Sequence, residues 1–229
     1  MLFAPGHPWF VDALECAAVR RRDRVLALFA DTAQVAALAQ LVGKEGAVTV
    51  VQPDLAIAEE LAALGLGNVE VLGNAIRGVE RFGSFDALVC APTANPDLPL
   101  GAYGELPRKN LRPGGRFALD LPAPRMLPQF VDAATALGWP AERLGKLAGP
   151  ADDALADVLR NAGLRRVRSL LGSHLVHAPS PADFLDGFAA ALALAASERA
   201  DLEQALVRAA GTVGAAEFLV HRSRVEAQR

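Results

Sequence analysis

Short apolar segments alternate with alanine-rich segments of helical pattern through the first half of the chain. The apolar segments are residues 24–29, 47–51, 69–72, 85–90 and 116–121. Apolar runs of this length, rich in β-branched residues, indicate strands buried on both faces. Helical patterns follow three of them, at residues 34–42, 55–64 and 102–111. The alternation predicts right-handed crossovers and a parallel sheet covered by helices on both faces.

The second half of the chain is less regular. Residues 122–150 are rich in proline and glycine and predict a cover or insert beside the strand ends. We expect a helix at residues 152–162, a strand at 164–176 with a bulge at Gly172, one or two helices at 181–210 and a last strand at 215–225. Residues 1–20 predict a helical lead-in whose pattern continues to residue 19. Residues 1–229 are expected to form a single α/β domain, because a chain of this length buries one substantial core.

Charge and composition narrow the possible partners. The net charge of −3 and the pI near 5.8 give no electrostatic footprint for nucleic acid or an anionic membrane. The run from Arg20 to Arg22 is interpreted as a solvated helix end. No apolar run is long enough to span a bilayer, and the N-terminus does not resemble a secretory signal. Cys16 and Cys90 lie in apolar surroundings and predict buried thiols, so we expect a cytoplasmic protein.

Three short motifs resemble the class I S-adenosylmethionine-dependent methyltransferase family. Residues 64–70 (LGLGNVE), 84–89 (SFDALV) and 111–116 (LRPGGR) are similar to the family's approach to strand three, its strand four and its turn into strand five. The resemblance covers roughly residues 20 to 225. It implies a doubly wound, mostly parallel seven-stranded Rossmann-like sheet with an antiparallel last strand, and S-adenosylmethionine as the cofactor.

The same resemblance shows a degenerate loop after strand one. The family's strand one ends in an acidic residue and an alternating-glycine loop, and the corresponding positions here are Ala27, then Phe29, Asp31 and Ala33. Glycine suits such a loop because it accepts a positive φ and has no Cβ. A phenylalanine at position 29 therefore occupies volume that the cofactor requires.

Two further family positions are altered. The carboxylate that accepts the ribose hydroxyls in the family corresponds to Gln52, with Asp54 two residues later as a partial substitute. A glutamine oxygen accepts a hydrogen bond but lacks the charge that makes the carboxylate interaction strong. The acid that contacts adenine corresponds to Asn74. The resemblance thus implies a weakened cofactor site at Phe29, Asp31, Ala33, Gln52, Asp54 and Asn74.

Other candidate residues have simpler interpretations. Asp31 precedes a helix and is interpreted as its N-cap. His174 and His177 lack a third ligand at metal-binding spacing, so no metal site is expected. Cys90 is interpreted as a small buried hydrophobe, and Asp86 as a residue that orients the backbone at the sheet end. Asp97 is the nearby carboxylate placed to touch a substrate, and a minority interpretation places Tyr103, Met126 and Trp139 in an apolar pocket. No catalytic residue is assigned.

Two functions remain open. One is a methyltransferase-fold protein that has lost or weakened S-adenosylmethionine binding and acts through protein contacts or regulation. The alternative is an active S-adenosylmethionine-dependent methyltransferase that acts on a small molecule. Either a small molecule or a protein is the expected partner, without nucleic acid or membrane. The apolar segment at residues 184–196 suggests homodimer formation, although the buried face of an internal helix has the same pattern.

Overall fold

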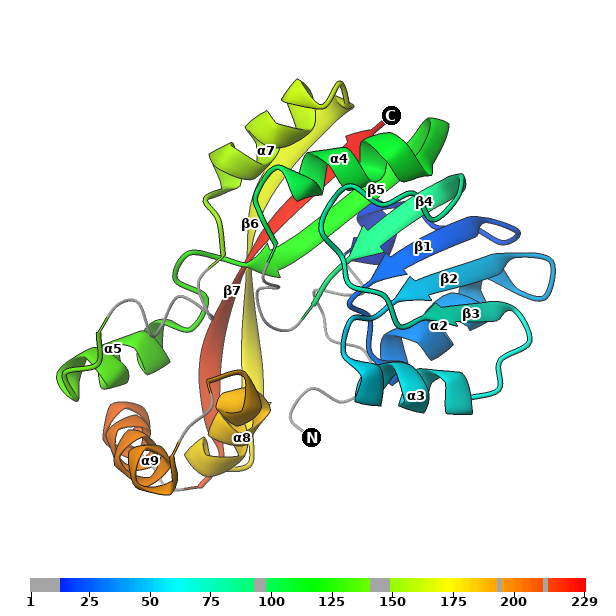
Figure 1. Cartoon of the computed structure of the whole chain (residues 1–229). Coiled ribbons are helices and arrows are strands. Elements are labelled where there is room, and N and C mark those ends of the chain that lie inside the picture. Colours follow the sequence, from blue (N-terminus) through cyan, green and yellow to red (C-terminus); the bar gives the residue numbers. More distant parts are fainter. Residues whose placement is uncertain (1–12, 93–97, 141–148, 193–194, 212–213) are drawn as a thin grey trace.

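A seven-stranded mixed sheet forms the centre of the molecule. The computed structural model describes residues 13–92, 98–140, 149–192, 195–211 and 214–229. The strand order is β3-β2-β1-β4-β5-β7-β6 (Figure 1). The strands are β1 (Arg24–Leu28), β2 (Ala47–Val51), β3 (Val69–Leu72), β4 (Phe85–Cys90), β5 (Leu111–Pro122), β6 (Arg165–Ala178) and β7 (Ala216–Gln228). β7 runs antiparallel to both β5 and β6, and β1 to β5 are parallel to one another.

The alternation of side chains along β1 assigns one helical layer to each face of the sheet. Val25 and Ala27 pack in one core, and this core also contains side chains of α2 (Thr32–Val42) and α3 (Leu55–Ala63). Leu26 and Leu28 pack in the opposite core, with α4 (Ala102–Asn110) and α7 (Asp152–Asn161). Successive residues of a strand point to opposite faces, so both faces of β1 are buried and the strand is apolar throughout.

The long β6–β7 pair extends beyond this α/β body, where three helices gather around it (Figure 1). These helices are α5 (Pro128–Ala136), α8 (Pro181–Leu192) and α9 (Ala196–Ala210). They form a further hydrophobic core with the distal half of the two strands. In it the rings of Phe184 and Phe218 are stacked with centroids 3.8 Å apart.

The predicted architecture is confirmed, with local corrections. The sheet has seven strands, mostly parallel, and the predicted region 181–210 forms two helices. The bulge expected at Gly172 is wrong, because Gly172 pairs regularly with Arg222 and the irregularity lies between Arg165 and Arg168. The lead-in helix ends at Cys16 rather than at residue 19, and Cys16 is only partly buried. β5 begins at Leu111, five residues earlier than predicted, with a register shift before Arg116.

Several predicted features have a definite place in this fold. Residues 122–150 contribute α5 to the distal core, while 141–148 and Asp97 lie outside the described residues. Phe184 and Leu185 belong to the same core, so at these two positions the apolar pattern marks an internal helix face. In the described part of the chain, none of the helices has both the length and the apolarity needed to cross a membrane.

Candidate functional site: the carboxyl edge of the parallel strands

The carboxyl ends of β1, β2 and β3 bring the predicted cofactor positions together. Leu28 is paired with Val51, and Val51 with Leu72, so the loops that follow these three strands leave the sheet side by side. The backbone continues this alignment, since Phe29 N donates to Val51 O at 3.1 Å and Gln52 N donates to Leu72 O at 3.0 Å. In open α/β sheets this edge is where ligands bind.

Phe29 adopts a backbone conformation that ordinarily belongs to glycine. Its φ is +56°, in the left-handed region, where the Cβ of an L-residue crowds the backbone. The half-buried ring packs against the core beneath β1 and β4. The loop therefore keeps a glycine-like turn but carries an aromatic side chain at that turn.

Gln52 is buried and uses both ends of its amide within the protein. Its Nε2 donates to Ala30 O at 3.3 Å, and its Oε1 accepts from Asp54 N at 3.2 Å. These two bonds connect the loop after β1 to the loop after β2. The side chain at the family's ribose position is thus committed to holding the two loops together.

The two aspartates at this edge are helix caps. The Asp31 Oδ1 accepts from Gln34 N at 2.8 Å, and Gln34 Oε1 accepts from Asp31 N at 3.2 Å, which makes a capping box at the start of α2. Asp54 Oδ1 accepts from Ala56 N at 3.0 Å and caps α3 in the same way. The interpretation of Asp31 as an N-cap is confirmed.

Ala33 and Gln34 lie in the first turn of α2, directly after the loop that follows β1. Gln34 Nε2 donates to Ala91 O at 3.1 Å, which ties the first turn of α2 to the end of β4. Ala33 is half-buried in that turn. Asn74 is the exception at this edge, because its side chain is exposed and makes no hydrogen bond to any residue that the structure describes.

The residues at this edge depart from those that the family resemblance implies for binding S-adenosylmethionine. At the position of the bare glycine turn stands a phenyl ring, and the ribose position holds an amide whose donor and acceptor are already bonded. Three cavities among the described residues, of about 680, 620 and 280 Å³, are lined by residues at other places. Asn74 remains as a polar group able to receive an external ligand.

A buried ionic network, which was not predicted from the sequence pattern, lies at the end of β5. Asp120 and Arg222 are fully buried, and Arg222 Nε donates to Asp120 Oδ1 at 2.7 Å. The Arg222 Nη2 also donates to Pro92 O at 2.6 Å and to Asp120 O at 2.7 Å, while Arg224 Nε donates to Asp120 Oδ2 at 3.1 Å. The network joins β4, β5 and β7 under the candidate site. Its available sequence signal was the charged Asp120 inside the apolar run 116–121.

The remaining titratable candidates have structural roles. Burial raises the pKa of the Cys90 thiol and also that of the Tyr103 hydroxyl, so both groups are neutral. Tyr103 and Met126 lie in the core, and the partly buried Trp139 makes an edge-on contact with Phe130, so these side chains pack rather than line a pocket. Asp86 Oδ2 accepts from Arg24 N at 2.7 Å, as the orienting role predicts.

The histidines of β6 do not form a metal site. His177 is exposed and lies 3.3 Å from Glu217, and His174, an odd number of residues away along the strand, points to the other face. Within the described ranges there is no group of three or more His, Cys, Asp or Glu side chains able to hold a metal ion.

Several solved structures share this fold, methyltransferases among them. The YcgJ protein from Bacillus subtilis has a TM-score of 0.65 at 15% identity, with 97% of this chain and 98% of that chain covered. For a putative methyltransferase from Bacillus halodurans the TM-score is 0.62 at 16% identity, with coverage of 96% and 97%. For a SAM-dependent methyltransferase from Aquifex aeolicus it is 0.53 at 16% identity, with coverage of 99% and 94%. No protein-family model matches the chain, and no curated protein matches it by sequence. The chain therefore has the class I methyltransferase fold.

Proposed function

We propose that this protein is a methyltransferase-fold scaffold that has lost S-adenosylmethionine binding and acts through protein contacts. The observation that supports this most strongly is the pair Phe29 and Gln52. One is an aromatic residue in a left-handed turn, and the other is a buried amide with both groups bonded internally. A fold does not determine a function, so the argument depends on these residues and not on the methyltransferase neighbours.

Ligand entry would require both residues to rearrange. Breaking the Gln52 Nε2 bond leaves the oxygen of the buried Ala30 unpaired, at about 1–3 kcal/mol, whereas Asp54 lies at the surface. Moving the Phe29 ring out of its partly buried position adds to this penalty. Because each 1.4 kcal/mol is about a tenfold change in affinity, the combined effect lowers the affinity by several powers of ten.

The outer edge of β6 is the surface that we propose for protein contacts. β6 is a 14-residue strand at the end of the sheet, and among the described strands only β7 pairs with it. Three large apolar side chains are exposed there, Leu170 (55%), Leu171 (60%) and Leu175 (60%). A long edge strand that pairs with a neighbour on one side only, and that exposes apolar side chains, is a template for pairing with another strand.

The spacing of these leucines favours a second copy of the chain as the partner. Leu171, Ser173 and Leu175 lie on one face, because alternate residues of a strand point the same way. If two β6 strands pair antiparallel about a two-fold axis at Ser173, Leu171 of each copy faces Leu175 of the other. The resulting contact is self-complementary, as a two-fold dimer requires.

Crystals soaked with S-adenosylhomocysteine test the loss of cofactor binding. The proposal predicts no ligand density beside Phe29, Gln52 and Asn74, and unchanged Gln52 bonds. Density for a nucleoside beside these residues would instead support the alternative, an active small-molecule methyltransferase. In that case Asn74→Ala should weaken binding, since Asn74 is the polar side chain at this edge that remains available.

Sedimentation velocity tests the contact surface separately. The wild-type chain should sediment as a dimer, and the double variant Leu171→Lys/Leu175→Lys as a monomer. Leu55→Lys is the matched control, because Leu55 is 65% exposed on α3, away from β6, and its replacement should leave the dimer intact. A monomeric wild-type chain would remove the proposed partner.

The free thiols of Cys16 and Cys90 fit the reducing cytoplasm that this proposal assigns to the protein.

A further inference from the structure

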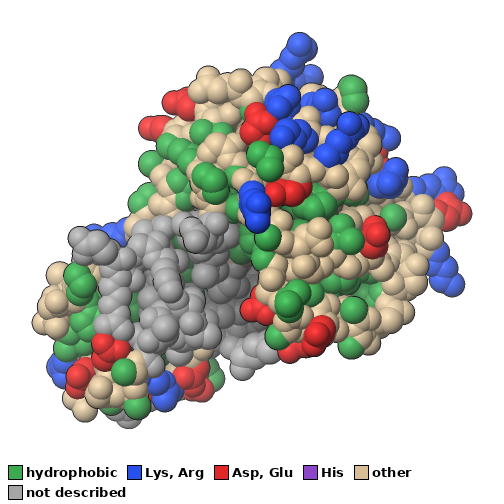
Figure 2. All heavy atoms as spheres, in the orientation of Figure 1, with side chains coloured by type: hydrophobic (Ala, Val, Ile, Leu, Met, Phe, Trp, Pro, Cys, Tyr) green, Lys and Arg blue, Asp and Glu red, His purple; other side chains and the backbone are tan. Residues whose placement is uncertain are grey.

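The edge of the sheet opposite the candidate cofactor site is rich in arginine. β1, β5 and β6 all begin at this edge and β7 ends there, so topology gathers residues that lie far apart in the sequence. Figure 2 shows Lys and Arg side chains collected along the upper and right border of the molecule. The cations are Arg20, Arg21, Arg22, Arg24, Lys44, Arg112, Arg116, Arg165, Arg166, Arg168 and Arg229.

Carboxylates neutralise only part of this charge. Four of the arginines have an acidic partner: Arg22 pairs with Glu45, Arg112 with Asp86, Arg116 with Asp23 and Arg168 with Glu226. Arg20, Arg21, Arg165 and Arg166 make no ion pair with any residue in the described part of the chain. The net charge of −3 for the whole chain thus conceals a strongly positive edge.

A cavity of about 280 Å³ opens at this edge, and four arginines line it. Arg20 comes from the segment before β1, Arg116 from β5, and Arg166 and Arg168 from β6. Arg116 is held in place, since its Nη2 donates to Asp23 Oδ2 at 2.6 Å and its Nη1 donates to Ala18 O at 2.7 Å. Glu226 is the carboxylate on the wall, 3.5 Å from Arg168.

Three residues of this edge have a strained backbone, and one of them, Arg166, lines the cavity. In the described residues, the non-glycine positions with positive φ are Phe29 and three residues of this edge, namely Ala18 (φ +44°), Arg22 (φ +70°) and Arg166 (φ +52°). Arg166 lies where the β6–β7 register is irregular. Such conformations persist only where the surrounding structure imposes them, and they cluster at functional sites. Here one of them directs an arginine without an ion-pair partner to the wall of the cavity.

We propose that this cavity is a binding site for a phosphate group. A carboxylate has two oxygens in one plane and is satisfied by a single guanidinium fork, whereas a phosphate presents its oxygens in several directions. Arginines of three separate segments line the cavity, and together they match the phosphate better. The cavity is close to the lower limit of ligand pockets, which suits one such group and not a large ligand.

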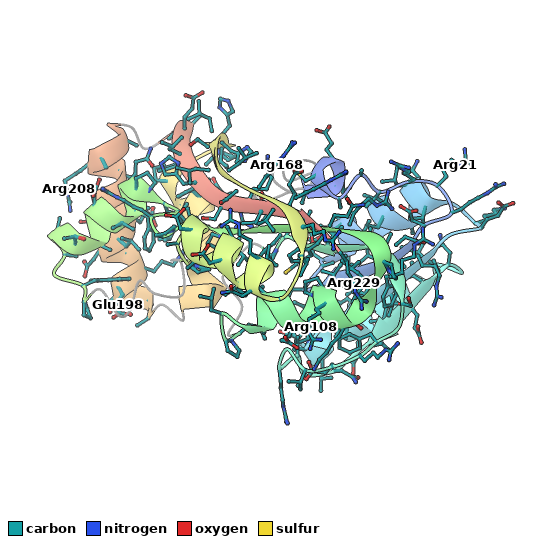
Figure 3. The ribbon with its side chains drawn as sticks, turned by 90° about the horizontal axis from the view of Figure 1, so that it is seen from above. Arg21, Arg108, Arg168, Glu198, Arg208 and Arg229 are labelled. Atoms are coloured by element: carbon teal, nitrogen blue, oxygen red, sulfur yellow. The ribbon has the colours of Figure 1, made fainter. Side chains whose placement is uncertain are left out.

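Calorimetric titration with pyrophosphate at low ionic strength tests the site. The wild-type chain should bind pyrophosphate, and Arg166→Gly and Arg20→Ala should each weaken binding by about tenfold or more. Glycine is chosen at position 166 because it accepts the φ of +52°, so this variant removes the guanidinium without adding strain. The control is Arg208→Ala, an exposed arginine of α9 at the distant end of the molecule (Figure 3), which should bind as wild type does.

Two further ligands decide the chemistry and the source of the phosphate. Malonate, a dicarboxylate, should bind at least about tenfold more weakly than pyrophosphate. The source is a nucleic-acid backbone if a short oligothymidylate binds more tightly than pyrophosphate and if Arg21→Ala weakens that binding. The source is a free phosphorylated molecule if pyrophosphate binds more tightly than the oligothymidylate. The proposal is overturned if pyrophosphate fails to bind at millimolar concentration, if malonate binds equally well, or if Arg208→Ala weakens binding as much as Arg166→Gly.

Discussion

At Phe29 we expect the glycine variant to be more stable than the alanine variant, which is the reverse of the usual order. At an ordinary position, glycine is less stable than alanine by about 0.5–1 kcal/mol, because glycine loses more backbone freedom on folding. At Phe29 the φ of +56° strains any residue that has a Cβ. Phe29→Gly and Phe29→Ala both remove the ring and its packing against the core, so the difference between the two variants isolates the strain.

The magnitude follows from two opposing effects. The left-handed conformation costs an L-residue roughly 1–2 kcal/mol, and glycine avoids this penalty. After the entropic disadvantage of glycine is subtracted, Phe29→Gly should be more stable than Phe29→Ala by about 1 kcal/mol. Both should differ from wild type by no more than a few kcal/mol, because the ring is only partly buried.

Urea denaturation of the two variants measures this difference. The control is the same pair of substitutions at Val79, which is 64% exposed in a loop and does not have a positive φ. There, Val79→Gly should be less stable than Val79→Ala by about 0.5–1 kcal/mol. If glycine were also the less stable replacement at position 29, the turn would not be strained and the loop would not be a glycine turn occupied by an aromatic residue.

Three other substitutions test the interior and one loop. Tyr103→Phe should raise the free energy of unfolding by about 1 kcal/mol, because the Tyr103 hydroxyl is buried with no hydrogen-bond partner in the described residues; a loss of stability in urea denaturation would reveal a bond to that hydroxyl. Asp120→Ala should lower it by about 3–5 kcal/mol, since it removes the carboxylate that balances the buried charge of Arg222, and the double variant with Arg222→Met should recover part of the loss in a double-mutant cycle. For Glu80, burial raises the pKa, but hydrogen bonds from the N–H groups of Arg77, Gly78 and Val79 outweigh it and lower the pKa. The stabilisation from the ionised Glu80 is therefore present above the ordinary pKa of 4.5 and is lost as the pH falls. The difference in free energy of unfolding between wild type and Glu80→Gln should accordingly shrink when the pH is lowered, and it should persist when the pH is raised.

The regular part of the fold follows closely from the sequence pattern. β2 and β4 begin and end where their apolar runs do, because strands buried on both faces leave an uninterrupted signal. The irregularity in β6 was misplaced because a glycine is the usual sequence mark of a bulge, whereas the structure sets it beside Arg166, which adopts the left-handed conformation without being a glycine.

The candidate site was only partly predictable for a different reason. The sequence placed Phe29, Gln52 and Asn74 at the ends of successive strands, and the cap at Asp31 follows from local chemistry. Whether Gln52 faces a ligand or bonds to its neighbours depends on contacts with Ala30 and Asp54 across two loops, which no spacing rule reports. The arginine edge was hidden in the same way, because Arg20, Arg116 and Arg166 meet only through the strand order.

A calorimetric titration of the wild-type chain with S-adenosylmethionine tests the central claim most directly. With Phe29 in the turn and Gln52 bonded on both sides, the account predicts no binding heat at micromolar ligand. The double variant Phe29→Gly/Gln52→Glu, which restores a bare turn and a carboxylate, should bind more tightly than wild type. Micromolar or tighter binding by the wild-type chain would contradict the account.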